Sequence, residues 1–168
     1  MATIDATVGG PSANSYITVA DATTFLETQL HYTDWVDADA ATQINALIEA
    51  TRQVDQLVDW NGEIASDTQA LRHPRKSLVD VDGRTIASTV IAPPVKNATA
   101  LLALYMIASN RNAERADIGI ESVSVAGAVN VQFSKRDQQK TIPEDVYRML
   151  QPYGNVVGYT SFVPITRS

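Results

Sequence analysis

The stretch Asp39–Trp60, DAATQINALIEATRQVDQLVDW, carries the clearest structural pattern in the chain. Its apolar side chains recur three and four residues apart, which is the spacing of one face of an amphipathic helix. Asp39 precedes the pattern as an N-cap, and the pair Asn61-Gly62 supplies the left-handed turn that ends a helix. We therefore predict a helix that runs from Asp39 to the WNG turn. Its apolar positions are Ile44, Leu47, Ile48, Val54, Leu57 and Val58.

Further helices are predicted on both sides of this one. Thr18 stands three residues before Asp21, as in a capping box, and opens a short helix that ends near Leu30. Pro93-Pro94 opens another, which runs to about Asn112 and is apolar on nearly all sides, so we expect it at the centre of the fold. Residues 15–112 thus form a helical core, and residues 143–153 form one more short helix.

In residues 116–136 the apolar side chains recur at every second position, so that apolar and polar residues alternate in two runs. The runs flank Ala126-Gly127, and this arrangement predicts an antiparallel β-hairpin. A two-stranded hairpin is marginal alone, so its tip at Gly127 is a candidate contact with a partner. The residues expected to share a face within each run are Val123 and Val125 in the first and Val129, Val131 and Phe133 in the second.

Both termini lack a regular period. Residues 1–14 are predicted to be an extended N-terminal arm, and residues 154–168 a C-terminal arm. The second arm is too apolar for a free tail, so we expect it to contact a neighbouring subunit or a partner. Its contact residues are Val156, Val157, Tyr159, Phe162, Val163 and Ile165. The chain is thus predicted to be one α+β domain (1–168), mainly α: a small helical bundle with an antiparallel β-hairpin and extended termini.

Composition and motifs restrict the function. The 168 residues have a net charge of -6, which disfavours a broad DNA-gripping surface, and there is no cysteine for thiol chemistry or a cysteine metal site. Phosphate-binding loops, HExxH and G-x-S-x-G are all missing, so we expect no cofactor, no metal and no enzyme activity. No leader-like start and no membrane-length apolar run is seen, which favours an intracellular protein without membrane contact.

The segment RHPRK contains a cluster of cations: Arg72, Arg75 and Lys76. One interpretation is a phosphate clamp. The other starts from Asp55, which falls on the apolar stripe of the central helix, where a carboxylate needs a partner. Arginine binds a carboxylate through two parallel bonds, so we favour a structural ion pair between Asp55 and Arg75, with Arg72 and Lys76 solvated.

Several motifs follow one another in an order that resembles the head–tail connector proteins of tailed bacteriophages, also called adaptor or head-completion proteins. They are ANSYITVADATTFL, ALIEATRQVDQLVDWNG, QALRHPR, DVDG and APPVKNATALLALYM. The resemblance covers roughly residues 12–108 and continues loosely to LQPYG. Some relatives carry the label DnaT-like single-stranded DNA-binding protein. His73 departs from the pattern, because relatives usually have an aromatic residue there.

The resemblance implies a structural role. Such adaptors bind the portal protein as a homo-oligomeric ring, usually of twelve copies, extend the DNA channel, and form the platform for the next tail component, of stopper or tail-terminator type. The protein would lie at the head–tail interface of the virion and in the host cytoplasm during assembly. Negative charge suits a channel through which DNA slides without specific binding. The alternative is a non-sequence-specific single-stranded DNA-binding protein.

Overall fold

The computed structural model describes residues 2–110, 122–125, 129–132 and 141–157. Its helices are α1 (Val19–Leu26), α2 (Thr33–Asp37), α3 (Ala40–Leu57), α4 (Pro93–Ala108) and α5 (Glu144–Leu150). Its strands are β1 (Val58–Trp60), β2 (Glu63–Ile64), β3 (Arg75–Lys76), β4 (Ser122–Val125), β5 (Val129–Gln132) and β6 (Gly154–Val156). The strands form antiparallel pairs, so the predicted α+β class with mainly helical content is confirmed.

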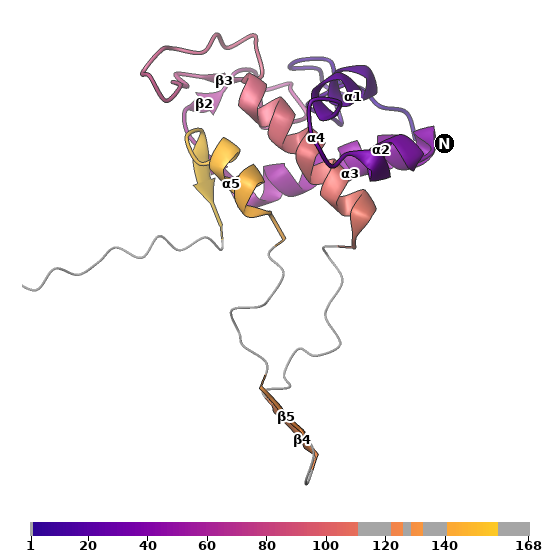
Figure 1. Cartoon of the computed structure of the whole chain (residues 1–168). Coiled ribbons are helices and arrows are strands. Elements are labelled where there is room, and N and C mark those ends of the chain that lie inside the picture. Colours follow the sequence, from indigo (N-terminus) through magenta and orange to yellow (C-terminus); the bar gives the residue numbers. More distant parts are fainter. Residues whose placement is uncertain (1, 111–121, 126–128, 133–140, 158–168) are drawn as a thin grey trace, which may run out of the picture.

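Helix α4 lies at the centre of the fold, as its apolar sequence predicts. It packs along α3 and also contacts α1, α2 and α5, so that no side of it is left entirely to solvent (Figure 1). Val95, Leu102 and the alanines at 98, 100 and 103 are buried in this packing. The small alanine side chains let neighbouring helices approach closely, which is why one helix can serve several partners.

The predicted helix starts agree with the structure, but the predicted helices end earlier than expected: α4 stops at Ala108 and not near Asn112, and α5 stops at Leu150. The Asp39 carboxylate accepts the Thr42 N–H at 2.7 Å, and the Thr18 hydroxyl accepts the Asp21 N–H at 3.1 Å. Helix α1 stops at Leu26, and Leu30, predicted to lie in this helix, is 92% exposed. Helix α3 stops at Leu57, because the next three residues leave the helix and form strand β1.

Helix α3 ends earlier than predicted because residues 58–60 form strand β1, which pairs with β6. Strand β6 lies almost 100 residues later in the sequence. The antiparallel register joins Val58 to Val156 and Trp60 to Gly154. A Cβ atom on Gly154 would lie 2.7 Å from the carbonyl oxygen of Asp59, so this close approach requires glycine. The first three residues of the predicted C-terminal arm are therefore a strand of the folded body, and residues 158–168 lie outside the described residues.

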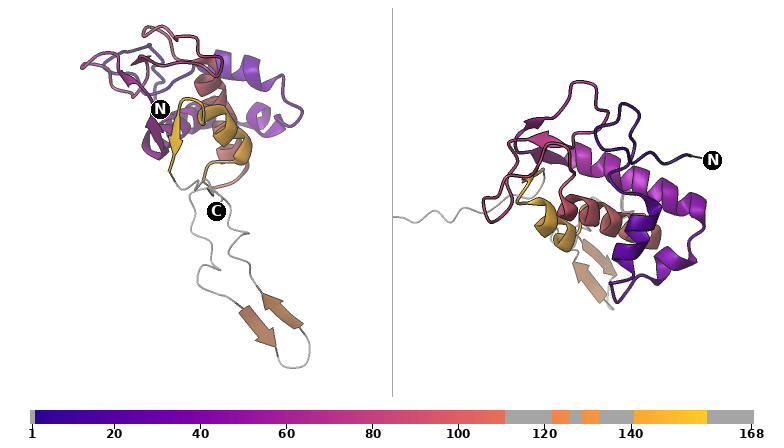
Figure 2. Two further views of the ribbon diagram at one scale, coloured as in Figure 1. Left: turned by 90° about the vertical axis from the view of Figure 1, so that its left-hand side faces the viewer. Right: turned by 90° about the horizontal axis from the view of Figure 1, so that it is seen from above.

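The N-terminal residues form a closed loop and not the predicted extended arm. The N–H groups of Asn14 and Ser15 both donate to the Asp5 carbonyl, at 2.8 and 3.1 Å. The Ala70 N–H donates to the Gly10 carbonyl at 3.1 Å, which fastens this loop to the segment before the RHPRK cluster. Figure 2 shows the N-terminal loop beside the long connection between α3 and α4.

The predicted β-hairpin is confirmed as β4 and β5. Val123 pairs with Val131 and Val125 with Val129, as the alternating pattern requires. The tip residue Gly127 lies outside the described residues, as does Phe133.

Candidate functional site

The RHPRK segment lies against the junction between α3 and β1. Strand β3 pairs with β2, so that Lys76 opposes Glu63 and Arg75 opposes Ile64. The side-chain amide of Gln69 donates to the Pro74 carbonyl at 3.1 Å and holds the segment in a loop. The cations are therefore held beside the turn that follows β1.

The Asp55 carboxylate has its hydrogen-bond partners within the fold. It accepts the hydroxyl of Tyr16, from the N-terminal segment, and the backbone N–H of Arg72 at 3.2 Å. Burial raises the pKa of Asp55, and these two hydrogen bonds oppose that rise because they favour the carboxylate. Burial, followed by the charge of Asp55 and the hydrogen bond to it, raises the pKa of the Tyr16 phenol well above its usual value.

Arg75 binds backbone carbonyls and not Asp55. Its guanidinium donates to the carbonyl oxygens of Gly62 at 2.6 Å, Asn61 at 2.7 Å and Arg72 at 3.2 Å. Gly62 turns the chain after β1 with a positive φ of 73°. The direct Asp55–Arg75 ion pair predicted from the sequence is therefore not formed: the turn binds the guanidinium, and Tyr16 reaches the carboxylate.

His73 is a core residue that the sequence reasoning did not assign to the site. Its side chain is 1% exposed and makes edge-on contacts with the rings of Tyr16 and Trp60, at centroid distances of 5.7 and 4.3 Å. Neither ring nitrogen has a hydrogen-bond partner. Burial, with a smaller effect from the Arg75 charge, lowers the pKa of His73 to about 4. The uncharged ring therefore packs between Tyr16 and Trp60 as part of the core.

The described body carries little free positive charge. Residues 2–110 and 141–157 contain seven Lys and Arg against fifteen Asp and Glu, so their net charge is -8. Three arginines form ion pairs, Arg52 with Glu49, Arg84 with Asp80 and Asp82, and Arg148 with Glu144. Arg75 is bound to carbonyls, and the Arg72 guanidinium lies 3.5 Å from the Val58 carbonyl oxygen. Within the described body, exposed Lys76 and half-buried Lys96 are the cations that have no such partner.

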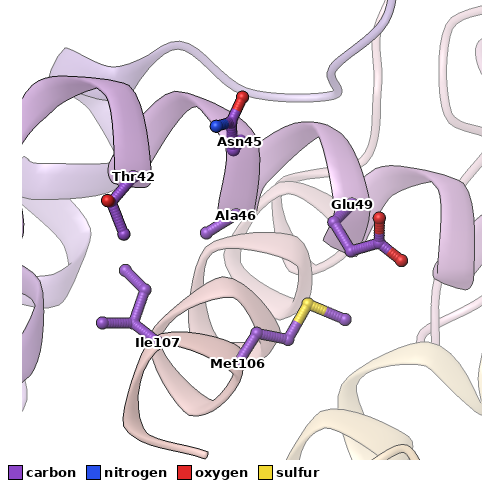
Figure 3. Close-up of a pocket in the computed structure, with 6 residues that line it drawn as sticks. All are labelled: Thr42, Asn45, Ala46, Glu49, Met106 and Ile107. Carbon is purple, nitrogen blue, oxygen red and sulfur yellow. The ribbon is translucent and has the colours of Figure 1, made fainter. Parts of the chain in front are cut away.

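A shallow groove opens between the first half of α3 and the end of α4, with a volume of about 400 Å³ (Figure 3). Ala46, Met106 and Ile107 supply apolar surface, and Glu49 brings a carboxylate to one end. The remaining lining residues are Thr42 and Asn45. The groove holds no cation and no nucleophile, so its chemistry suits apolar side chains better than a phosphate.

Comparison with known proteins identifies the family. Residues 2–168 match a family described as "Putative DnaT-like ssDNA binding protein". The chain belongs to this DnaT-like family. No curated protein and no solved structure matches it.

The predicted contact residues of this DnaT-like chain divide into two groups. Val156 is 2% exposed and lies in β6, so it is a residue of the core and not a free contact. Val157, next to it, is 61% exposed. The others lie outside the described residues: Gly127, Tyr159, Phe162, Val163 and Ile165.

The described part of the DnaT-like chain holds no group of His, Asp or Glu side chains that could bind a metal ion. The DVDG motif forms a turn, in which Asp80 Oδ1 accepts the N–H groups of Asp82 and Arg84 and Gly83 has a φ of 79°. Among the described residues, no helix has both the length and the apolar character needed to cross a membrane.

Proposed function

We propose that this DnaT-like protein is a structural head–tail adaptor of a tailed bacteriophage. It binds the portal as a multi-copy ring, extends the DNA channel and forms the platform for the next tail component. The ring of twelve copies and the location at the head–tail interface rest on the resemblance described above. No chemistry is required of the protein in this role, only stable contacts and a surface that does not hold DNA.

The observation that supports this proposal most is the neutralisation of cations within the fold. The arginines of the RHPRK segment bind carbonyls of the same chain, and the body around them has a net charge of -8. Proteins that grip DNA place free Lys and Arg against phosphates. An acidic wall repels the phosphates and lets DNA slide, as a channel requires.

The direct test is electron microscopy of the full-length protein mixed with the portal of the same phage. We expect added density on one end of the portal, with rotational symmetry that matches or divides that of the portal. Portals that stay bare at a large excess of protein would refute the adaptor role.

The family match favours a second candidate function, binding of single-stranded DNA. Residues 111–140 connect α4 to α5 in the sequence, and in this stretch five Lys and Arg residues stand against four Asp and Glu residues. Lys135 and Arg136 follow Phe133 there, and single-strand binders combine cations with aromatic side chains that stack on bases. The second function would therefore depend on this stretch and not on the RHPRK segment.

Fluorescence anisotropy with a labelled oligonucleotide separates the two functions. The adaptor role predicts weak binding at physiological salt, about the 10⁻⁴–10⁻⁶ M range of non-specific contacts or weaker. Tighter binding that is lost in the double variant Lys135→Gln and Arg136→Gln would favour the second function. Arg84→Gln is the matched control, because it removes a cation that is already paired with carboxylates.

A further inference from the structure

The groove between α3 and the end of α4 has an apolar floor of Ala46, Met106 and Ile107 with polar side chains beside it, and it has no occupant among the described residues. Figure 3 shows Ile107 pointing from α4 toward Thr42 and Ala46 on α3, while the Met106 side chain extends along the groove on the side of Glu49. Its volume of about 400 Å³ lies within the ~300–1,000 Å³ typical of ligand pockets. We propose that this groove binds the C-terminal segment 158–168 of the same chain.

The segment starts close enough to reach the groove. The Val157 N–H donates to the Leu57 carbonyl at 2.7 Å, so the segment leaves the body at the C-terminal end of α3. The groove lies on the same helix between Thr42 and Glu49. With a helical rise of 1.5 Å per residue, these two residues lie about 12–22 Å along the helix from Leu57. Eleven extended residues span up to about 36 Å, so the segment covers this distance with residues to spare.

The chemistry of the segment matches that of the groove. The sequence GYTSFVPITRS contains aromatic and aliphatic side chains and no acidic one, and Arg167 is its single cation. Apolar side chains would cover Met106 and Ile107, while Arg167 would be attracted to a body with a net charge of -8. The stretch 111–121, which follows α4, is a poorer occupant because five of its eleven residues are charged.

Segment 158–168 of the same chain is favoured as the occupant of the groove over the equivalent segment of a second copy, because it is covalently attached. A short flexible linker gives its attached segment an effective concentration in the millimolar range. A second copy at micromolar concentration would have to bind far more tightly to displace it. The segment of the same chain is therefore the expected occupant in the free protein.

The absence of cysteine allows a clean test by disulfide crosslinking in the full chain. Asn45→Cys places a thiol on the exposed wall of the groove, and Phe162→Cys places one in the middle of the segment. Leu30→Cys with Phe162→Cys is the control, because Leu30 is 92% exposed but lies outside the groove. Oxidation is followed on non-reducing gels and by mass spectrometry of the linked peptides.

We expect the 45–162 pair to form an intramolecular disulfide at least ten times faster than the 30–162 pair. Adding Ile165→Asp should remove this advantage without affecting the fold of the body, since residue 165 lies beyond β6. Equal rates for the two pairs would overturn the proposal, and so would 45–162 crosslinks that appear only between two chains. Neither a portal nor DNA is present in this experiment, so its result is independent of the proposed function.

Discussion

Replacement of His73 by phenylalanine should change how the stability of the protein depends on pH. The ring lies buried between Tyr16 and Trp60, with both nitrogens unpartnered. Phenylalanine offers a ring of similar width that keeps the edge-on contacts and cannot bind a proton. The variant therefore removes the titration and leaves most of the packing.

The sign and size of the effect follow from the shifted pKa. The pKa of His73 falls from 6.5 to about 4 on folding, so below pH 6.5 the unfolded chain takes up the proton before the folded one does. The stability that neutral His73 contributes is complete above pH 6.5 and is lost as the pH falls toward 4. A difference of about 2.5 pKa units corresponds to about 3.4 kcal/mol in total, of which about 2 kcal/mol is lost by pH 5.

Urea unfolding at pH 7.5 and at pH 5 measures this loss. Carboxylates also titrate in this range, but they are shared by both proteins and cancel in the comparison. The decrease in unfolding free energy between the two pH values should be about 2 kcal/mol larger in the wild type than in His73→Phe. His31 is exposed and lies outside this cluster, and His31→Phe provides the control for replacing a histidine elsewhere in the chain.

The reasoning would be refuted if the wild type and His73→Phe lost the same unfolding free energy between pH 7.5 and pH 5, within about 0.5 kcal/mol. Protonation of His73 would then contribute almost nothing to the pH dependence of stability. The absolute stability at pH 7.5 gives a second check. The variant should be as stable as the wild type or more so, since it removes two buried polar atoms that lack partners.

Other predictions concern the hydrogen bonds around the RHPRK segment, each measured by thermal and urea unfolding. Tyr16→Phe removes a hydrogen bond to a partly buried carboxylate and should cost about 1.5–3 kcal/mol, part of which Asp55→Asn should restore. Arg75→Ala leaves three carbonyls without their donor and should cost about 1–3 kcal/mol, whereas exposed Lys76→Ala should stay within about 0.5 kcal/mol. Gly62→Ala should cost more than about 2 kcal/mol, because φ is 73° and the new Cβ would lie 2.3 Å from the Lys76 carbonyl oxygen.

Local patterns predicted four of the five helices among the described residues and the hairpin, but not the short helix α2, whose N-cap Tyr32 makes no side-chain capping hydrogen bond. Asp39 and Thr18 act as N-caps because their side chains reach N–H groups only a few residues away. The end of α3 depends instead on β6, whose residues lie on the far side of the hairpin in the sequence. Val58 to Trp60 continue the helical spacing closely enough that only the structure shows them as a strand.

The candidate site was predictable in its burial but not in its pairing. The stripe of α3 correctly placed Asp55 toward the interior, where a carboxylate needs donors. The donor is Tyr16, in a segment that closes into a loop because Asp5 binds Asn14 and Ser15. Nothing in the local pattern of residues 1–14 indicates that closure, so the sequence alone points to an arginine as the partner.

The placement of charge in the chain limits where each candidate function can reside. In the described body the arginines are bound to carbonyls or carboxylates, so a phosphate approaching the RHPRK segment would have to displace these bonds. That exchange is unfavourable against a net charge of -8, and within the described body Lys76 and half-buried Lys96 offer two contacts at most. We therefore propose that any binding of single strands comes from residues 111–140 or Arg167, whereas the proposed channel wall needs only the acidic body. If the double variant at Lys135 and Arg136 keeps tight oligonucleotide binding, this placement is wrong and the single-stranded DNA function rests on other residues; if the wild type binds oligonucleotides only weakly, its charge supports the adaptor role.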